Sequence, residues 1–176
     1  DQIIVVALDE DTLSQFSYRS PIDRAFIASL IERIDSAGAK AIGVDVLIDQ
    51  ASDLAKDERL YSVVRAVKTP LHFSFTSDRA FVTEPQLEYM RSFVPPEKRM
   101  ESRLLSDPFD GLVRRVNPGG IASGDHIIYD DDHPPSFAAV MAGYLDAPQL
   151  RAPREIAWRP LSADGEDPFP VISANY

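Results

Sequence analysis

The hydrophobic pattern is clearest in the first fifty residues of the chain. Two apolar runs, residues 3–8 and 41–44, show no polar alternation, which is typical of strands covered on both faces of a parallel sheet. Each run is followed directly by an aspartate, Asp9 and Asp45. Apolar residues recur at helical spacing between the runs. The pattern therefore predicts a right-handed strand–helix–strand unit with both aspartates at one carboxyl edge of the sheet, where open α/β sheets usually bind ligands.

The predicted helix of this unit covers residues 22–37. Ser20 is placed to cap its amino end, Pro21 suits the first helical position, and Asp23 stands at the capping-box distance from Ser20. Gly38 marks its end. The apolar stripe expected to face the sheet comprises Phe26, Ile27, Leu30, Ile31 and Ile34.

Helical and strand patterns continue to alternate after this unit. Helical spacing returns at residues 52–67 and 84–94, and a short apolar run between them, residues 71–75, predicts a third strand. Ser52 and Asp53 are both candidate caps for the first of these helices. Residues 95–103 are polar, and we expect a flexible connection there.

The pattern changes from residue 104. Asp110-Gly111 is a turn signal, and the residues after it predict one arm of a β-hairpin at 112–116. Short strands and one helix complete the pattern. The strands are expected at 127–129, 156–158 and 171–173, and the helix opens at Pro135 or Ser136.

These elements predict a single α/β domain over residues 1–176. Its mixed sheet is expected to be parallel in a βαβ-rich part, residues 1–94, and antiparallel in a β-rich part with one helix, residues 104–176, with helices flanking the sheet. A chain of 176 residues is long enough to bury roughly two-thirds of its unfolded surface.

Composition narrows the function classes. The 28 acidic residues against 18 Lys and Arg give a net charge of −10, which argues against nucleic acid or anionic lipid as a partner. The chain has no cysteine, so disulfides, thiolate catalysis and cysteine zinc sites are excluded. No segment approaches the roughly 20 apolar residues that span a bilayer. Because the chain begins with Asp1 rather than Met and enters a strand at once, we expect a piece of a longer protein, without the part that anchored it.

The main candidate site combines Asp9, Arg24 and Asp45, with Glu10 beside Asp9. Arg24 falls in the first turn of the predicted helix, near the carboxyl edge that carries both aspartates. An arginine fork can bind a carboxylate bidentately and a helix amino end adds donors, so the set could recognise a small polar or charged ligand. The alternative is a structural clasp that ties loop to sheet, as ion-pair networks at strand ends often do. The sequence slightly favours the clasp and leaves both open.

An enzyme is the rival hypothesis. Residues 9–12, Asp-Glu-Asp-Thr, follow a hydrophobic strand and resemble the nucleophile motif of haloacid-dehalogenase-type phosphatases, with Asp9 as nucleophile and Asp11 as acid. Asp130 and Asp131 could then bind magnesium. However, Thr12 comes one position earlier than the threonine of that motif, and no lysine lies at an obvious position at the end of a predicted strand. The motif therefore lacks the structural context that the phosphatases require.

Two further groups are weaker candidates. Asp130, Asp132 and His133 could bind a divalent cation, but a solvated acidic loop is the commoner outcome for such a run. Arg114 and Arg115 would point to opposite faces of their strand, so at most one of them could line a given pocket. No glycine-rich phosphate loop or Ser-His-Asp order is present, and we expect no cofactor.

Several segments, in their order and spacing, resemble the type-two CHASE domain, an extracellular sensory module. They correspond to its opening strand and helix, an acid-glycine turn with a basic strand, a helix start and a final strand: residues 3–10, 21–24, 37–45, 110–115, 135–138 and 172–176. The chain departs from the family at Arg19-Ser20-Pro21-Ile22, where members commonly carry an aromatic residue beside the proline.

This resemblance implies a periplasmic or extracellular sensor without catalytic activity of its own. Transmembrane helices of the same chain would lie before and after it. The output would be cytoplasmic: an adenylate or guanylate cyclase, a histidine kinase, a diguanylate cyclase or phosphodiesterase, or a serine/threonine kinase. The stimulus would be an unknown small molecule or envelope signal, and the full receptor is expected to act as a homodimer. A purely structural spacer is the remaining alternative.

Overall fold

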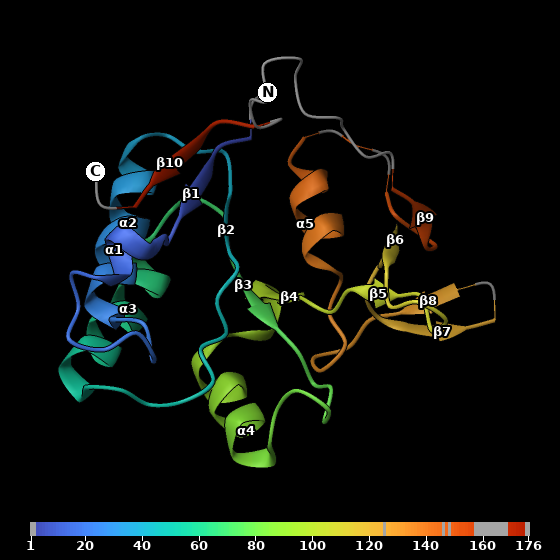
Figure 1. Cartoon of the computed structure of the whole chain (residues 1–176), viewed down its shortest axis with the longest axis horizontal. Helices are drawn as coiled ribbons and strands as arrows, with labels where there is room; N and C mark the ends of the chain where they lie inside the picture. The colour runs from blue at the N-terminus through green and yellow to red at the C-terminus, as the bar shows by residue number, and fades with distance from the viewer. Residues whose placement is uncertain (1–2, 125, 146, 148, 157–168, 175–176) are drawn as a thin grey trace.

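The computed structural model describes residues 3–124, 126–145, 147, 149–156 and 169–174. A three-stranded parallel sheet with strand order β2–β3–β4 lies at its middle (Figure 1). Two βαβ units build this sheet, because α3 connects β2 to β3, and α4 with the short 3₁₀ helix η1 connects β3 to β4. The elements are β2 (Ile42–Val44), α3 (Leu54–Ala66), β3 (Leu71–Phe75), α4 (Glu84–Phe93), η1 (Pro96–Lys98) and β4 (Arg99–Glu101).

The main hydrophobic core lies on one face of this sheet, under helices α2 (Arg24–Ser36) and α3. Its members come from α2, β2, α3, β3 and the end of α4, as expected when consecutive right-handed crossovers place their helices on the same face. The apolar stripe predicted for α2 supplies two of them, Ile27 and Ile31. The largest fully buried apolar members are Phe73, Ile31, Ile48, Leu60, Leu71, Val64 and Val94.

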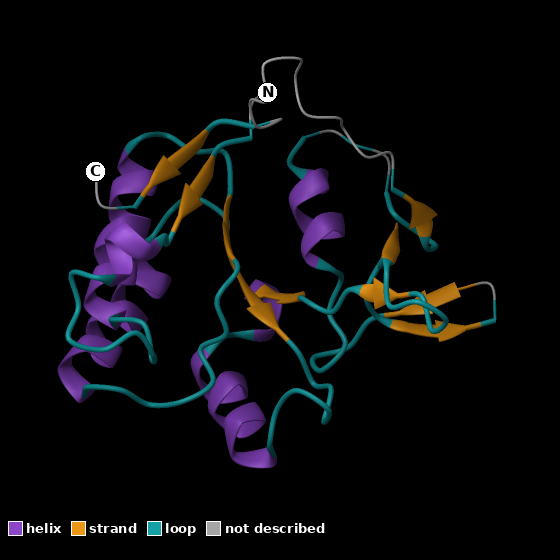
Figure 2. Ribbon diagram, in the orientation of Figure 1, coloured by secondary structure: helices purple, strands orange, loops and turns teal. Residues whose placement is uncertain are grey.

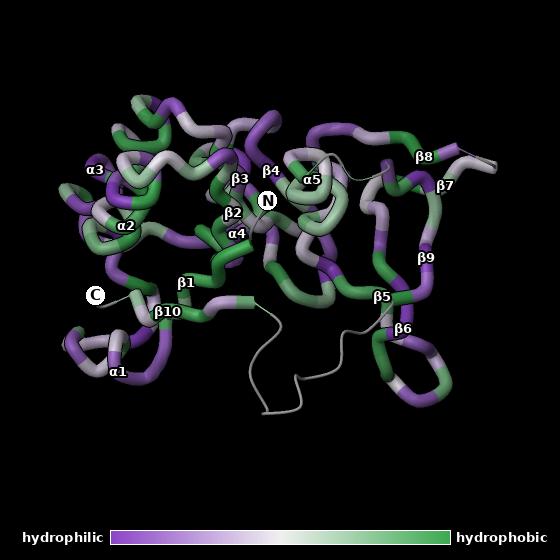
Figure 3. Tube along the Cα trace, turned by 90° about the horizontal axis from the view of Figure 1, so that it is seen from above, coloured by the Kyte–Doolittle hydropathy of each residue, from purple (hydrophilic) through white to green (hydrophobic). Residues whose placement is uncertain are grey.

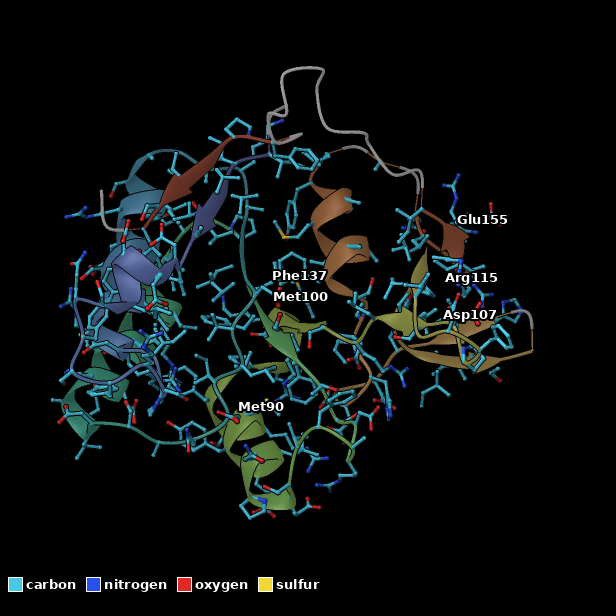
Figure 4. All side chains as sticks on the ribbon, viewed as in Figure 1. Met90, Met100, Asp107, Arg115, Phe137 and Glu155 are labelled. Carbon is cyan, nitrogen blue, oxygen red and sulfur yellow. The ribbon has the colours of Figure 1, made fainter. Side chains whose placement is uncertain are left out.

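Helix α5 (Phe137–Gly143) packs against the other face of the central sheet. A Cβ atom on Gly43 would lie 2.7 Å from Phe137 Cζ and 3.0 Å from Met141 Sδ, so only glycine lets the helix approach β2 this closely. Next to it, His72 Nε2 and the hydroxyl of Tyr144 are 2.8 Å apart. Met100 of β4 is fully buried, and Figure 4 shows its label next to that of Phe137 of α5.

The first and last strands form a separate ribbon. β1 (Val5–Ala7) pairs in parallel with β10 (Val171–Ser173), and no ladder joins β1 to β2 among the residues described. The strands at 3–8 and 41–44 therefore do not share one sheet, as the predicted strand–helix–strand unit requires, because a local pattern does not specify which distant strand completes a ladder. The predicted cover on both faces is wrong too: Ile4 is 55% and Ile172 49% exposed, and Figure 3 shows both strands as hydrophobic segments.

The antiparallel strands lie toward the end of the chain, as predicted (Figure 2). One sheet has the order β5–β6–β9 and the other is the β7–β8 hairpin. The predicted Asp110-Gly111 turn is confirmed, with Gly111 at φ +73°. These strands are β5 (Leu105–Ser106), β6 (Val113–Val116), β7 (Ile121–Ser123), β8 (His126–Ile128) and β9 (Arg154–Glu155). β9 lies before the strand expected at 156–158, of which positions 157 and 158 are outside the described residues.

Two other predictions need correction. The cap of α2 is Asp23, whose carboxylate accepts the amide of Phe26, and the predicted cap Ser20 lies outside the helix. The expected connection at 95–103 contains η1 and the buried strand β4. The charged residues at both ends of β4 are the reason that the sequence did not predict this strand. Arg99 can be buried, with 5% of it exposed, because its guanidinium donates hydrogen bonds to the carbonyls of Arg91, Val94 and Asp131.

The α/β class is confirmed, with parallel pairing in the first part of the chain and antiparallel pairing toward its end. Asp53 caps α3, one of the two caps predicted for it, and α5 begins after the predicted Ser136. Within the described ranges, no helix is both long enough and apolar enough to cross a bilayer.

Candidate functional site

Arg24 lies at the centre of a buried polar cluster. The residue is 1% exposed and stands at the first turn of α2. Its Nη2 donates to the carbonyl of Gln50 at 3.3 Å, and its Nε lies 3.8 Å from Asp57 Oδ1 without a hydrogen-bond partner. Burial lowers the pKa of Arg24, and the carboxylate of Asp57 opposes that shift. The guanidinium thus ties the start of α2 to α3 and to the loop before it.

Asp57 is held in place by its own hydrogen bonds. Ser52 donates to its carboxylate twice, from the amide at 2.8 Å and from the hydroxyl at 2.7 Å, and the Tyr89 hydroxyl lies at 3.4 Å. Asp57 is not among the candidate residues that the sequence pattern indicates. Its signal would have been a carboxylate on the core-facing side of a predicted helix, one turn after the capping Asp53.

Lys56 and Asp23 extend the same cluster toward the surface. The Lys56 ammonium pairs with the Asp23 carboxylate, which also caps α2. Burial acts to raise the pKa of Asp23, but the hydrogen bonds from Lys56 and from the Phe26 amide outweigh it, so the pKa lies below its ordinary value. Both ends of this pair belong to the junction between α2 and α3.

Asp9 serves a different junction. It caps the short helix α1 (Glu10–Leu13) by accepting the amide of Thr12 at 2.9 Å and its hydroxyl at 2.7 Å. The Thr12 hydroxyl is in turn 3.2 Å from that of Ser173, at the end of β10. Hydrogen bonds from Thr12 and Ser173 lower the pKa of Asp9. Beside it, Glu10 forms an exposed ion pair with Arg19.

Asp45 stands apart from both groups. It follows β2 and accepts the hydroxyl of Ser74 at 2.6 Å. The predicted set of Asp9, Arg24 and Asp45 is therefore not brought together by hydrogen bonds or ion pairs in the described part of the chain. The expectation placed both strands in one sheet, whereas β1 pairs with β10 and β2 with β3.

The acidic loop before α5 is held by ion pairs. Arg91 of α4 binds Asp132 with two hydrogen bonds, 2.8 Å from Nε and 2.5 Å from Nη2, and His133 Nδ1 lies 2.9 Å from Asp130 Oδ1. The hydrogen bond from Arg91 lowers the pKa of Asp132, and the one from His133 lowers that of Asp130. No group of three or more potential ligands that could hold a metal ion occurs in the described residues.

Arg114 and Arg115 lie on the exposed antiparallel sheet. Arg114 binds Asp110 with two hydrogen bonds, which secures the turn before β6, and lies 3.4 Å from Asp107. Arg115 stands opposite Glu155 in the strand register, and Figure 4 places its label between those of Glu155 and Asp107. Both arginines thus lie among acidic side chains at the surface.

A cavity of about 470 Å³ opens on the side of α5 that faces β8. The sequence gives no sign of this cavity, because its lining comes from separate segments that only the fold brings together. These are β8, α5 and residues 149–151.

The chain belongs to the CHASE2 domain family, since the model of that family matches residues 1–176, its whole length. CHASE2 domains are extracellular sensor domains of receptors. No curated protein and no solved structure matches the chain.

Proposed function

We propose that this domain is the extracytoplasmic sensor of a transmembrane receptor. It would lie in the periplasm or outside the cell and regulate a cytoplasmic output such as a nucleotide cyclase, a histidine kinase or a diguanylate cyclase. Transmembrane helices of the same chain would connect the two, and the receptor would act as a homodimer. The family match supports this proposal, and the domain itself would carry no catalytic step.

The observation that carries the mechanism is the parallel ribbon of the first and last strands. Val5, Val6 and Ala7 of β1 stand opposite Val171, Ile172 and Ser173 of β10. The hydroxyl contact between Thr12 and Ser173 joins the carboxyl ends of the two strands. Because the two strands are parallel, the segment before β1 and the segment after β10 leave the ribbon at opposite ends, and a shift of the ribbon would displace both of them.

We propose structural positions for the charged residues singled out in the sequence. Arg24 would be a clasp between α2 and α3, because a guanidinium that is 1% exposed is out of reach of an incoming ligand. Asp9, with Glu10 beside it, would hold the end of the β1–β10 ribbon, and Asp45 would fix β2 to β3 through Ser74. Ligand-induced change would then act on the ribbon whose end Asp9 holds, as long as the ligand binds two states unequally.

Chemical labelling in intact cells tests the location. The chain contains no cysteine, so a single Ala152→Cys at an exposed position in a cysteine-free full-length receptor gives one reactive thiol in this domain. We expect a membrane-impermeant maleimide to label it in intact spheroplasts. A matched cysteine in the output domain should be labelled only after lysis. Labelling of both thiols only after lysis would overturn the proposal.

A further inference from the structure

The cavity beside α5 has the size and construction of a small-molecule site. Its volume of about 470 Å³ falls within the range of about 300–1,000 Å³ that is typical of ligand pockets. One wall is apolar, with Ile127 of β8 and Ala139 and Val140 of α5. The lining also includes the polar side chains of Gln149 and Arg151. This combination of an apolar wall and a few polar groups is what orients a bound small molecule.

The polar lining carries positive charge and donors although the chain as a whole has a net charge of −10. Arg151 supplies the charge, His126 and Gln149 supply further polar groups, and Tyr129 adds an aromatic ring. None of the lining residues within the described ranges is acidic. The acid next to Tyr129, Asp130, accepts hydrogen bonds from the amides of Asp132 and His133 and pairs with the His133 ring, so its carboxylate belongs to its own turn.

Most hydrogen-bond donors of the lining side chains make no hydrogen bond to the described part of the protein. The one hydrogen bond recorded there for the Arg151 side chain runs from Nη2 to Gln149 Oε1 at 3.3 Å, although a guanidinium has five N–H donors. The imidazole of His126 makes no hydrogen bond to the described residues. A planar, permanently charged fork with open donors matches the geometry of a carboxylate.

We propose that this cavity is the ligand site of the sensor and takes a small molecule that joins a carboxylate to an apolar group. The carboxylate binds Arg151, with His126 and Gln149 as further polar partners, and the apolar part lies against Tyr129 and Val140. This inference rests on the proposed function, and it names the class of ligand and the place where it binds.

The position of the cavity also supplies a route for the signal. α5 has the cavity on one side, at Ala139 and Val140, and the central sheet on the other, at Gly43 and His72. None of the α5 residues is fully buried, and a helix with few buried contacts belongs to the parts of a protein that move at low cost. A ligand in the cavity would therefore shift α5 against β2 and β3.

Binding of a carboxylate panel to the 176-residue chain tests the proposal. Benzoate, phenylacetate and hexanoate would be titrated while amide chemical shifts are followed by NMR, with benzyl alcohol as the neutral comparison. We expect saturable shifts at the amides of His126, Tyr129 and Arg151 with at least one carboxylate and none with the alcohol. Absence of saturable shifts at these amides for all three carboxylates would overturn the proposal.

Two variants separate the cavity from general charge effects. Arg151→Gln is expected to weaken carboxylate binding at least tenfold, whereas Arg154→Gln, which removes the same charge from exposed β9, should leave it unchanged. Val140→Trp should block binding while the amide spectrum of the central sheet stays native. Equal weakening by both arginine variants would overturn the proposal. The labelling test of the receptor's topology does not depend on these binding measurements. Failure of the proposed ligand site can therefore be distinguished from failure of the proposed sensor function.

Discussion

The hydroxyl oxygens of Thr12 and Ser173 are 3.2 Å apart although the residues are separated by 161 positions. Thr12 is fully buried and also donates its hydroxyl to Asp9. The end of the first strand, the cap of α1 and the end of the last strand thus meet in one hydrogen-bonded group. This group closes the ribbon that we propose as the route to the flanking segments.

Thr12→Val removes the hydroxyl from this group and keeps the side chain's shape. The fully buried Thr12 side chain loses its hydrogen bonds to Asp9 and Ser173, both part-buried, so we expect the free energy of unfolding to fall by about 1–3 kcal/mol. Urea denaturation measures it. Ser14→Ala is the control, because that hydroxyl makes an exposed hydrogen bond to the Asp11 carbonyl and its loss should cost less than about 0.5 kcal/mol. Equal losses in the two variants would contradict the buried group.

Arg24→Met tests the clasp between α2 and α3. Removing one partner of a buried ion pair strands the other, so we expect a loss of about 3 kcal/mol in the free energy of unfolding. Arg59 offers a matched control, because it joins the same two helices through an ion pair with Glu32 whose side chains are 49% and 53% exposed. Arg59→Met should cost less than about 1 kcal/mol. A small loss for Arg24→Met, comparable with that of the control, would instead indicate a site in which Arg24 awaits a ligand.

His72 predicts a pH dependence of stability. Burial first, and the charge of Lys98 second, lower its pKa below the ordinary 6.5, and its Nδ1 has no hydrogen-bond partner. The unfolded chain therefore binds the proton more readily, and stability contributed by the neutral imidazole is lost as the pH falls below about 6.5, with a slope of at most about 1.4 kcal/mol per pH unit. In His72→Gln this part of the dependence should vanish. Parallel stability curves for the two proteins between pH 5 and 8 would show that His72 is not the cause.

Gly43→Ala tests the contact between α5 and the central sheet. The new methyl group would meet the Phe137 ring and Met141, and such overpacking costs about 1–3 kcal/mol. Gly143→Ala is the control, since a Cβ there meets nothing within 4 Å and should stabilise the chain slightly. Adding Phe137→Leu to Gly43→Ala should recover part of the loss. If thermal unfolding shows no cost for Gly43→Ala, α5 does not pack on β2 as described.

The local elements could be predicted from the sequence because local chemistry determines them. The strand at 71–75, the Asp53 cap and the Asp110-Gly111 turn need only neighbouring residues, and all three are present. The partners could not be predicted in the same way. β4 was hidden because Arg99 and Glu101 are charged, and only the fold supplies the carbonyls that satisfy Arg99.

In the candidate site, too, single residues could be identified from the sequence but their partners could not. Arg24 was singled out, as a ligand-binding residue or a clasp, from its place at a helix start, but its partner Asp57 on α3 lies 33 positions further along and follows from the packing of α2 on α3. The pairing of β1 with β10 depends on strands from the two ends of the chain. Residue patterns specify elements, whereas packing specifies which elements meet.

The output of the full-length receptor in membranes is the most direct measurement of the sensor proposal. Its cyclase, kinase or other activity would be compared between the native receptor, Thr12→Val at the ribbon, Ser14→Ala, and Arg24→Met, which lowers stability but lies away from the ribbon. We expect Thr12→Val to change the activity by roughly fivefold or more, the lower end of typical coupling between sites, and the other two variants to leave it unchanged while folded. The same activity in all four receptors would contradict the account and identify the domain as a passive spacer.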